Sequence, residues 1–183
     1  HHAENSKGMG FFFFKNVALA AAYAKEKYKL KRVAIVDFDV HHGNGTEDIV
    51  KHKKGYLFCS TYQYPFFPFE IKESTKPPII NTPLDATTKS ADFRQAILDT
   101  WLPALNKFKP QMIFISAGFD AHIEDDMSQV SLVDEDYRWV TDQIKAVADK
   151  YAQGRIVSVL EGGYSLSALG RSAVAHINGL IGY

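Results

Sequence analysis

The sequence predicts an α/β protein in which a parallel sheet is flanked by helices. First, short apolar runs rich in β-branched residues alternate with longer stretches of helical periodicity. Second, these runs lack polar alternation, which is typical of strands buried on both faces of a sheet. Third, acidic residues and glycines follow several of the runs at their carboxyl ends. Parallel α/β sheets bind their ligands at that edge, so a functional site is expected there.

The first elements occupy residues 14–53. Alanines and Val17 at helical spacing predict a helix over residues 14–29. A β-branched apolar run predicts a buried strand over 32–38. Thr46 is a suitable cap for a short helix over 47–53, because a threonine hydroxyl can accept a hydrogen bond from a free amide of the first turn.

The middle of the chain predicts two strands, a long loop and a helix. Apolar runs predict strands over Tyr56–Ser60 and Ile79–Pro83. The segment 61–78 between them is rich in proline and aromatic residues and has no period, so we expect a long loop. Helical spacing predicts a helix over Ala91–Phe108, with a kink or break at Pro103 because proline cannot donate a backbone hydrogen bond.

The last third of the chain continues the alternation of strand and helix. Apolar runs predict strands over Met112–Ser116 and Ile156–Leu160. Helical spacing predicts helices over Asp134–Tyr151 and residues 165–181. Strands separated by helices are typical of parallel sheets, because a parallel connection must cross the face of the sheet.

Composition limits the class of protein. The 183 residues suit one domain with a sizeable core, and the formal net charge is zero. Direct contact with nucleic acid, which needs a basic surface, is therefore not expected. No apolar run approaches the roughly 18 residues of a membrane span, so we expect no membrane association. The single cysteine, Cys59, excludes an internal disulfide and fits a reducing compartment, which favours a cytoplasmic location.

The run from Asp37 to His41 is the most informative motif in the chain. Asp37, Asp39 and His41 are each two positions apart, so their side chains would share one face of an extended strand. Asp120 follows a later strand and is expected at the same edge of the sheet. Asp39, His41 and Asp120 therefore form a candidate three-ligand metal site. Two carboxylates and an imidazole suit Zn²⁺ or Fe²⁺ without any thiolate.

Other residues of this edge allow two interpretations each. Tyr164 follows two glycines at a strand end and is either an oxyanion donor or a buried core residue. His42 points away from His41 by strand alternation, which favours a structural role. His122 lies in an acidic loop and is interpreted as solvated. The opening pair His1-His2 is either the remnant of a purification tag or a functional pair.

Four motifs occur in the order in which a known family has them. They are His1-His2-Ala3 with Gly10-Phe11, the run from Asp37 to Thr46, the run from Ser116 to His122, and Leu160-Glu161-Gly162-Gly163-Tyr164. They resemble the zinc-dependent histone deacetylase family, which includes acetylpolyamine amidohydrolases and acetoin-utilisation proteins. Asn44 and Glu161 are closest to its class II and bacterial branch. The resemblance runs almost end to end and implies an arginase/deacetylase-like fold.

The resemblance also changes the interpretation of the first residues. A tag would not be followed by Ala3, nor by Gly10-Phe11 at the family's spacing, so His1-His2 are interpreted as active-site histidines. Residues 1–183 would then be a single partial catalytic domain, the C-terminal part of the whole, without its N-terminal part. Missing strands would expose a sheet edge and apolar packing surface. We therefore expect the isolated fragment to be unstable or inactive.

Two cation sites are implied by position in the family. Asp39, His41 and Asp120 would bind Zn²⁺, which would polarise an amide carbonyl and lower the pKa of its water. A structural monovalent cation, usually K⁺, would be held partly through backbone oxygens. The residues that match this second site are Asp37, Asp39, His41, Ser60 and Thr61.

The family implies a role for the residues around the zinc. His2 would be the general base and then the acid that protonates the leaving amine. His1 would act mainly through its charge and would be oriented by Asp37, while Asn44 would orient His2. Tyr164 would donate a hydrogen bond to the tetrahedral oxyanion.

The implied reaction removes acetyl or other acyl groups from lysine side chains or related acetylated amines. Phe11, Phe67, Gly163 and Met127 would form the substrate channel. Met127 stands where the polyamine-selective class II member carries a glutamate, and an apolar residue gives a cationic polyamine no charge partner. An acetylpolyamine amidohydrolase is nevertheless an alternative, and a non-catalytic acyl-lysine-binding or scaffold domain is another. The loop after Phe67 is shorter than in the family, which alters the channel rim.

Overall fold

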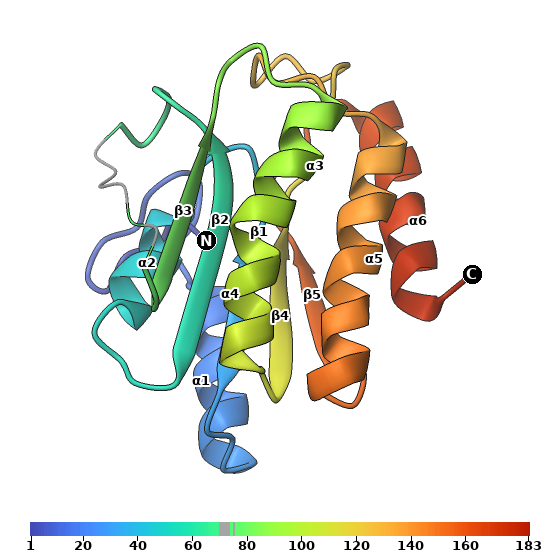
Figure 1. Ribbon diagram of the computed structural model, residues 1–183. Coiled ribbons are helices and arrows are strands. Elements are labelled where there is room, and N and C mark those ends of the chain that lie inside the picture. Colours follow the sequence, from blue (N-terminus) through green and yellow to red (C-terminus); the bar gives the residue numbers. More distant parts are fainter. Residues whose placement is uncertain (70–73, 75) are drawn as a thin grey trace.

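Five parallel strands form one sheet in the computed structural model, which describes residues 1–69, 74 and 76–183 (Figure 1). The strands are β1 (Val33–Asp37), β2 (Tyr56–Gln63), β3 (Ile79–Leu84), β4 (Met112–Ala117) and β5 (Ile156–Leu160). The helices are α1 (Asn16–Lys27), α2 (Asn44–Val50), α3 (Ser90–Asp99), α4 (Trp101–Phe108), α5 (Asp134–Tyr151) and α6 (Leu166–Ile181). Across the sheet the order is β3-β2-β1-β4-β5, which confirms the predicted parallel α/β class.

The register of the sheet brings the functional strand ends to one level. β1 lies in the middle of the sheet and all of its residues are buried, as its continuous apolar run predicts. Asp37 at the end of β1 pairs with Ser60 of β2 on one side and with Ser116 of β4 on the other. The segments that leave these strands therefore start side by side at the carboxyl edge.

Two layers of helices cover the sheet. The larger core cluster includes Val36 of β1, Trp101 of α4 and Ile144 of α5, and α6 packs on α5. The smaller cluster, on the other face, joins Val17 of α1 to Phe58 of β2. Figure 1 shows α3 and α4 in front of the strands, with α5 and α6 beside them. Among the described residues, no helix is long and apolar enough to cross a membrane.

Two expected boundaries in the first half are wrong. β2 continues to Gln63, because Thr61 and the next two residues pair in register with β3. The predicted loop over 61–78 therefore begins later, and its residues 70–73 and 75 lie outside the described residues. α2 begins at Asn44 with Gly43 as its N-cap, so Thr46 lies inside the helix and is no cap.

The predicted helix over Ala91–Phe108 is two helices, and the break is not at Pro103. α3 ends at Asp99, Thr100 separates the helices, and α4 begins at Trp101. A proline ring collides with the carbonyl of the residue four positions earlier, which is Asp99 here. That collision is avoided when the chain leaves the helix at Thr100, and Pro103 then lies in the first turn of α4, where its missing amide costs nothing.

Candidate active site

The candidate metal ligands converge at the carboxyl edge of the sheet. Ligand atoms of Asp39, His41 and Asp120 all lie within 4.8 Å of one another, and the three side chains are buried. His41 Nδ1 lies 3.2 Å from Asp39 Oδ1 and 3.1 Å from Asp120 Oδ2. Asp120 is 79 positions from His41 in the sequence, so the sheet register rather than local structure brings them together.

Backbone hydrogen bonds, rather than strand alternation, orient the two ligands after β1. The strand ends at Asp37, so the extended segment expected through His41 does not form. The carboxylate of Asp37 accepts the backbone N–H of Asp39 at 3.1 Å, and the carboxylate of Asp39 accepts that of His41 at 2.8 Å. Aspartates often bind the amide two residues on in this way. Each carboxylate is thereby held by the chain that follows it.

Two glycines make room for the carboxylates. A Cβ placed on Gly118 or on Gly162 would collide with the Asp39 or Asp120 side chain. Gly162 N–H donates to Asp39 Oδ2 at 2.8 Å, and Val40 N–H donates to Asp120 Oδ1 at 2.9 Å. The backbone therefore approaches both carboxylates closely enough to hydrogen-bond them, which only a residue without a side chain permits at position 162.

His1 lies in a strongly acidic environment. Its Nδ1 is 2.7 Å from Asp37 Oδ2, and its Nε2 is 3.6 Å from Asp39 Oδ1. Burial by itself would lower the pKa of His1, but Asp37 and Asp39 outweigh it and raise the pKa to about 10. In the absence of metal, His1 is therefore a cation at neutral pH.

His2 is the neutral member of the pair, and Asn44 sets its tautomer. Its Nδ1 lies 2.8 Å from Asn44 Oδ1, while the Asn44 amide nitrogen donates to Glu4 Oε1 at 2.9 Å. Because the Asn44 oxygen can only accept, Nδ1 of His2 carries the proton and Nε2 keeps its lone pair. Burial and the nearby charge of His1 lower the pKa of His2 to about 3.

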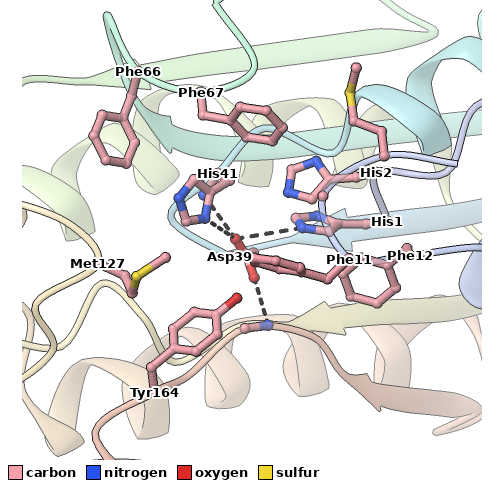
Figure 2. Close-up of a pocket in the computed structure, with 13 residues that line it drawn as sticks. His1, His2, Phe11, Phe12, Asp39, His41, Phe66, Phe67, Met127 and Tyr164 are labelled. Atoms are coloured by element: carbon pink, nitrogen blue, oxygen red, sulfur yellow. Dashed lines mark hydrogen bonds and ion pairs between the residues drawn. The ribbon is translucent and has the colours of Figure 1, made fainter.

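Tyr164 points into the same cavity. Figure 2 shows its hydroxyl directed toward Asp39, on the side away from His2. Burial, followed by the charges of Asp120 and Asp39, raises the pKa of Tyr164 to about 12. The phenol therefore keeps its proton at neutral pH and can donate a hydrogen bond.

An apolar cavity of about 410 Å³ opens above the metal cluster. Phe67 and Met127 line it as expected, and Phe11 forms its outer rim with most of its side chain exposed (Figure 2). Gly163 does not line it, because the space that a side chain would take there faces Leu169 and Phe119. The residues around the cavity are His1, His2, Met9, Gly10, Phe11, Phe12, Asp39, His41, Phe66, Phe67, Met127, Gly162 and Tyr164.

Two of the residues expected to hold a monovalent cation, Ser60 and Thr61, lie in β2, next to the end of β1. Ser60 and Thr61 are buried in β2, and Ser60 is the register partner of Asp37. Among the described residues, no hydrogen-bond partner is found for the buried Ser60 hydroxyl. An unpaired buried hydroxyl is costly, so this oxygen is suited to a ligand that the protein itself does not supply.

The comparisons with known proteins identify the family. A model described as the histone deacetylase domain matches residues 1–180. The chain belongs to the histone deacetylase family. Two relatives with deacetylase names match almost all of this chain. Type-2 histone deacetylase 2 of Dictyostelium discoideum is 39% identical over 99% of this chain and 12% of its own length. Polyamine deacetylase HDAC10 of Mus musculus is 36% identical over 100% of this chain and 28% of its own length.

A solved structure of the histone deacetylase family has the same fold. The crystal structure of the HDA15 HD domain matches with a TM-score of 0.90 and 31% sequence identity. The match covers 99% of this chain and 53% of that chain. The fold predicted from the family resemblance is thus confirmed. This chain spans about half of the solved chain and less than a third of the two relatives.

Some site residues of this histone deacetylase family member escape sequence reasoning. Phe66 stacks on His41 with ring centroids 5.3 Å apart, and Phe12 also lines the cavity. Their only signal is that each adjoins a predicted channel phenylalanine. The expectation that His122 is solvated is wrong, because it is buried and stacks on Tyr137. His42 contacts Asn81 Oδ1 at 2.9 Å and lines no part of the cavity, in agreement with a structural role.

Proposed function

We propose that the protein containing this chain is a zinc-dependent amidohydrolase that removes acetyl or other acyl groups from lysine side chains or related acetylated amines. The observation that carries the proposal is a buried carboxylate–imidazole cluster at the base of an apolar cavity, beside two oriented histidines. Family membership supports deacylation as the reaction. The proposal concerns the whole protein, since the chain spans only part of its relatives.

The residues present fit zinc. Asp39, His41 and Asp120 provide the oxygen and nitrogen ligands that catalytic zinc takes, in a set of three that leaves a position free. Gly118 and Gly162 leave space that a Cβ would fill, so the carboxylates can stay close together. Zinc in this position would polarise the acyl carbonyl and make water more acidic.

The remaining residues would move protons and stabilise charge. His2 would accept a proton from the attacking water at Nε2, because Asn44 holds its other proton on Nδ1. The same atom would then return the proton to the leaving amine. Tyr164 would donate its hydroxyl proton in a hydrogen bond to the oxyanion. His1, held by Asp37, would keep positive charge near the developing anion.

The cavity favours a neutral acylated chain over a cationic polyamine. Among its described lining residues, the acidic side chain is Asp39, at the metal end. Phe67 and Met127 also line the cavity, and neither offers a carboxylate that could pair with a distant ammonium group. We therefore place acyl-lysine first and an acetylpolyamine second. We also assign K⁺ to Asp37, Asp39, His41, Ser60 and Thr61, and the unpaired Ser60 hydroxyl supports this.

The test combines metal content with turnover of an acetyl-lysine peptide by the full-length protein. One equivalent of zinc and measurable deacetylation are expected. Tyr164→Phe should keep the zinc but lower kcat roughly 10²–10³-fold, because an oxyanion donor is lost. Tyr28→Phe is the matched control, since it removes an exposed hydroxyl of the loop after α1.

The outcomes separate the competing functions. Zinc binding without turnover would favour a non-catalytic acyl-lysine-binding domain. Faster hydrolysis of acetylspermidine than of the peptide would favour the acetylpolyamine amidohydrolase. Unchanged turnover in Tyr164→Phe would remove the role assigned to the phenol.

A further inference from the structure

Asp125 gathers three backbone amides beside the cavity. Its Oδ2 accepts the N–H of Tyr164 at 2.6 Å and that of Ser165 at 3.0 Å. Its Oδ1 accepts the N–H of Met127 at 3.0 Å. The side chain is buried, and neither the metal site nor the proton transfers described above use it. One carboxylate thus ties the segment that carries the phenol to the segment that forms the channel wall.

These bonds differ from an ordinary helix cap. A capping side chain normally accepts an amide from the first turn of the helix, two or three positions after the cap. Ser165 is the N-cap of α6, and Asp125 binds the amides of Ser165 and of the residue before it. The carboxylate therefore holds the strand-to-helix connection itself rather than the end of α6.

The connection between β5 and α6 needs such an anchor because it contains a glycine, Gly163, whose backbone has more conformational freedom than that of other residues. On one side, Gly162 is fixed by its bonds to Asp39 and to Phe119, at 2.8 Å each. The next residue, Gly163, has φ 140°, a backbone conformation that is open to glycine. On the other side, the hydrogen bonds from Tyr164 and Ser165 to Asp125 fix the direction of the chain.

Packing does little to hold the phenol. The Tyr164 side chain is 47% exposed, and Leu166 after it is 80% exposed. Among the described residues, no aromatic ring stacks on Tyr164. The direction of its hydroxyl therefore depends on the backbone on either side of it, and one of those two anchors is Asp125.

We infer that Asp125 is a positioning residue that sets the place of the Tyr164 hydroxyl relative to the metal cluster. The loop that begins with Asp120 supplies this anchor five positions later, so a single loop holds a metal ligand and aims the oxyanion donor. Ser128 reinforces the loop by donating to the Asp120 carbonyl oxygen at 2.9 Å. The inference rests on the proposed function, because it assigns Asp125 to the same reaction.

The experiment is a double-mutant cycle on the full-length protein, with an acetyl-lysine peptide as substrate. Asp125→Ala should lower kcat roughly 10–100-fold, since a misplacement of about 1 Å can cost 10²-fold. In the Tyr164→Phe background the same change should lower kcat by less than about 2-fold, because residues acting through one interaction are not additive. Zinc content should remain one equivalent in every variant.

Two further variants separate positioning from loss of folding. Asp125→Asn keeps one acceptor oxygen, which can still bind the backbone N–H groups of Tyr164 and Ser165. This variant should therefore be more active than Asp125→Ala. Asp126→Ala removes the adjacent, exposed carboxylate, which makes no hydrogen bond among the described residues, and should leave kcat unchanged.

The result that overturns the inference is an equal loss in both backgrounds, or a loss of zinc or of folding that accounts for the activity. Unchanged kcat in Asp125→Ala would overturn it as well. If wild-type protein and Asp126→Ala show no turnover, the proposed function fails and the inference fails with it. If Tyr164→Phe lowers kcat and Asp125→Ala does not, the inference fails alone.

Discussion

At the scale of single residues, the adjacent histidines His1 and His2 have opposite protonation states at neutral pH. His1 and His2 have ring centroids 4.0 Å apart, yet one pKa is raised and the other is lowered. Burial lowers both pKa values, but Asp37 at Nδ1 and the nearby Asp39 outweigh it for His1, whereas His2 has a neutral amide oxygen at Nδ1 and is further lowered by the charge of His1. A carboxylate stabilises an imidazolium, whereas an amide oxygen orients a neutral ring without adding charge. The pair can therefore combine a fixed charge with a proton acceptor.

Substitutions of Asn44 test whether its side chain keeps His2 neutral and correctly oriented. Asn44→Ala should lower kcat about 10–100-fold, which is typical when the partner that orients a catalytic histidine is removed. Asn44→Asp should keep the tautomer but raise the pKa of His2, because a carboxylate favours the charged ring. A base must be neutral to act, so the acidic limb of the kcat/KM profile should move to higher pH.

Profiles of kcat/KM against pH for the wild type, Asn44→Ala and Asn44→Asp check this prediction. An unchanged acidic limb in Asn44→Asp would show that His2 is not the group that titrates there. Loss of zinc in Asn44→Ala would instead assign the residue to the metal site.

At the scale of elements, the glycine that follows β5 and a glycine inside α6 differ in the space around them. The chain after β5 approaches two carboxylates closely at Gly162, whereas a Cβ added at Gly170 of α6 would meet nothing within 4 Å. Two substitutions of the same kind should therefore have opposite effects. The reason is that an added methyl group either meets atoms already in place or merely reduces the freedom of the unfolded chain.

Gly162→Ala and Gly170→Ala make this comparison. The Cβ of Gly162→Ala would collide with Asp120 and lie 2.7 Å from Asp39 Oδ2, so zinc affinity and turnover should fall. Gly170→Ala has nothing within 4 Å of the new atom and should raise the free energy of unfolding by about 0.4–1 kcal/mol. Zinc titration and denaturant unfolding of both variants would measure the two effects. A stable Gly162→Ala protein with normal zinc affinity would show that the backbone at residue 162 does not need to lie so close to the Asp39 and Asp120 carboxylates.

At the scale of the whole molecule, several segments are held together around buried carboxylates. Burial and the charge of Asp39 raise the pKa of Asp120 to about 6, because the two carboxylates repel each other. A bound cation would relieve this repulsion, so the site should couple metal to stability. Some apolar side chains are exposed elsewhere: Leu160 at the end of β5 and Ile177 of α6 are more than half exposed. The expected instability of the isolated chain stays a prediction.

Zinc should therefore stabilise the full-length protein, and more at pH 8 than at pH 6. At 100 times its Kd, zinc adds about 2.7 kcal/mol to the free energy of unfolding. Burial lowers the pKa of His41, but Asp120 and Asp39 outweigh it and raise the pKa to about 9. Without metal, this protonated His41 stabilises the fold at low pH, and that contribution is lost as pH rises through about 9.

Zinc binds the deprotonated ring, so its own contribution grows over the same pH range. Thermal unfolding with zinc and with a chelator, at both pH values, would measure the difference. Asp120→Asn is the control and should reduce the shift. If zinc raised the unfolding temperature by the same amount at pH 6 and pH 8, zinc binding would not displace a proton from His41.

The sequence by itself determined the alternation of strands and helices, the Asp37–His41 motif and the family. These depend on local periods and contiguous residues, which side-chain chemistry dictates over a few positions. Tertiary structure alone decided the break at Thr100, the burial of His122, the stacking of Phe66 on His41 and the grip of Asp125 on Tyr164. Those features join residues from separate segments, and only the packing of the complete sheet with its helices brings such residues within contact distance.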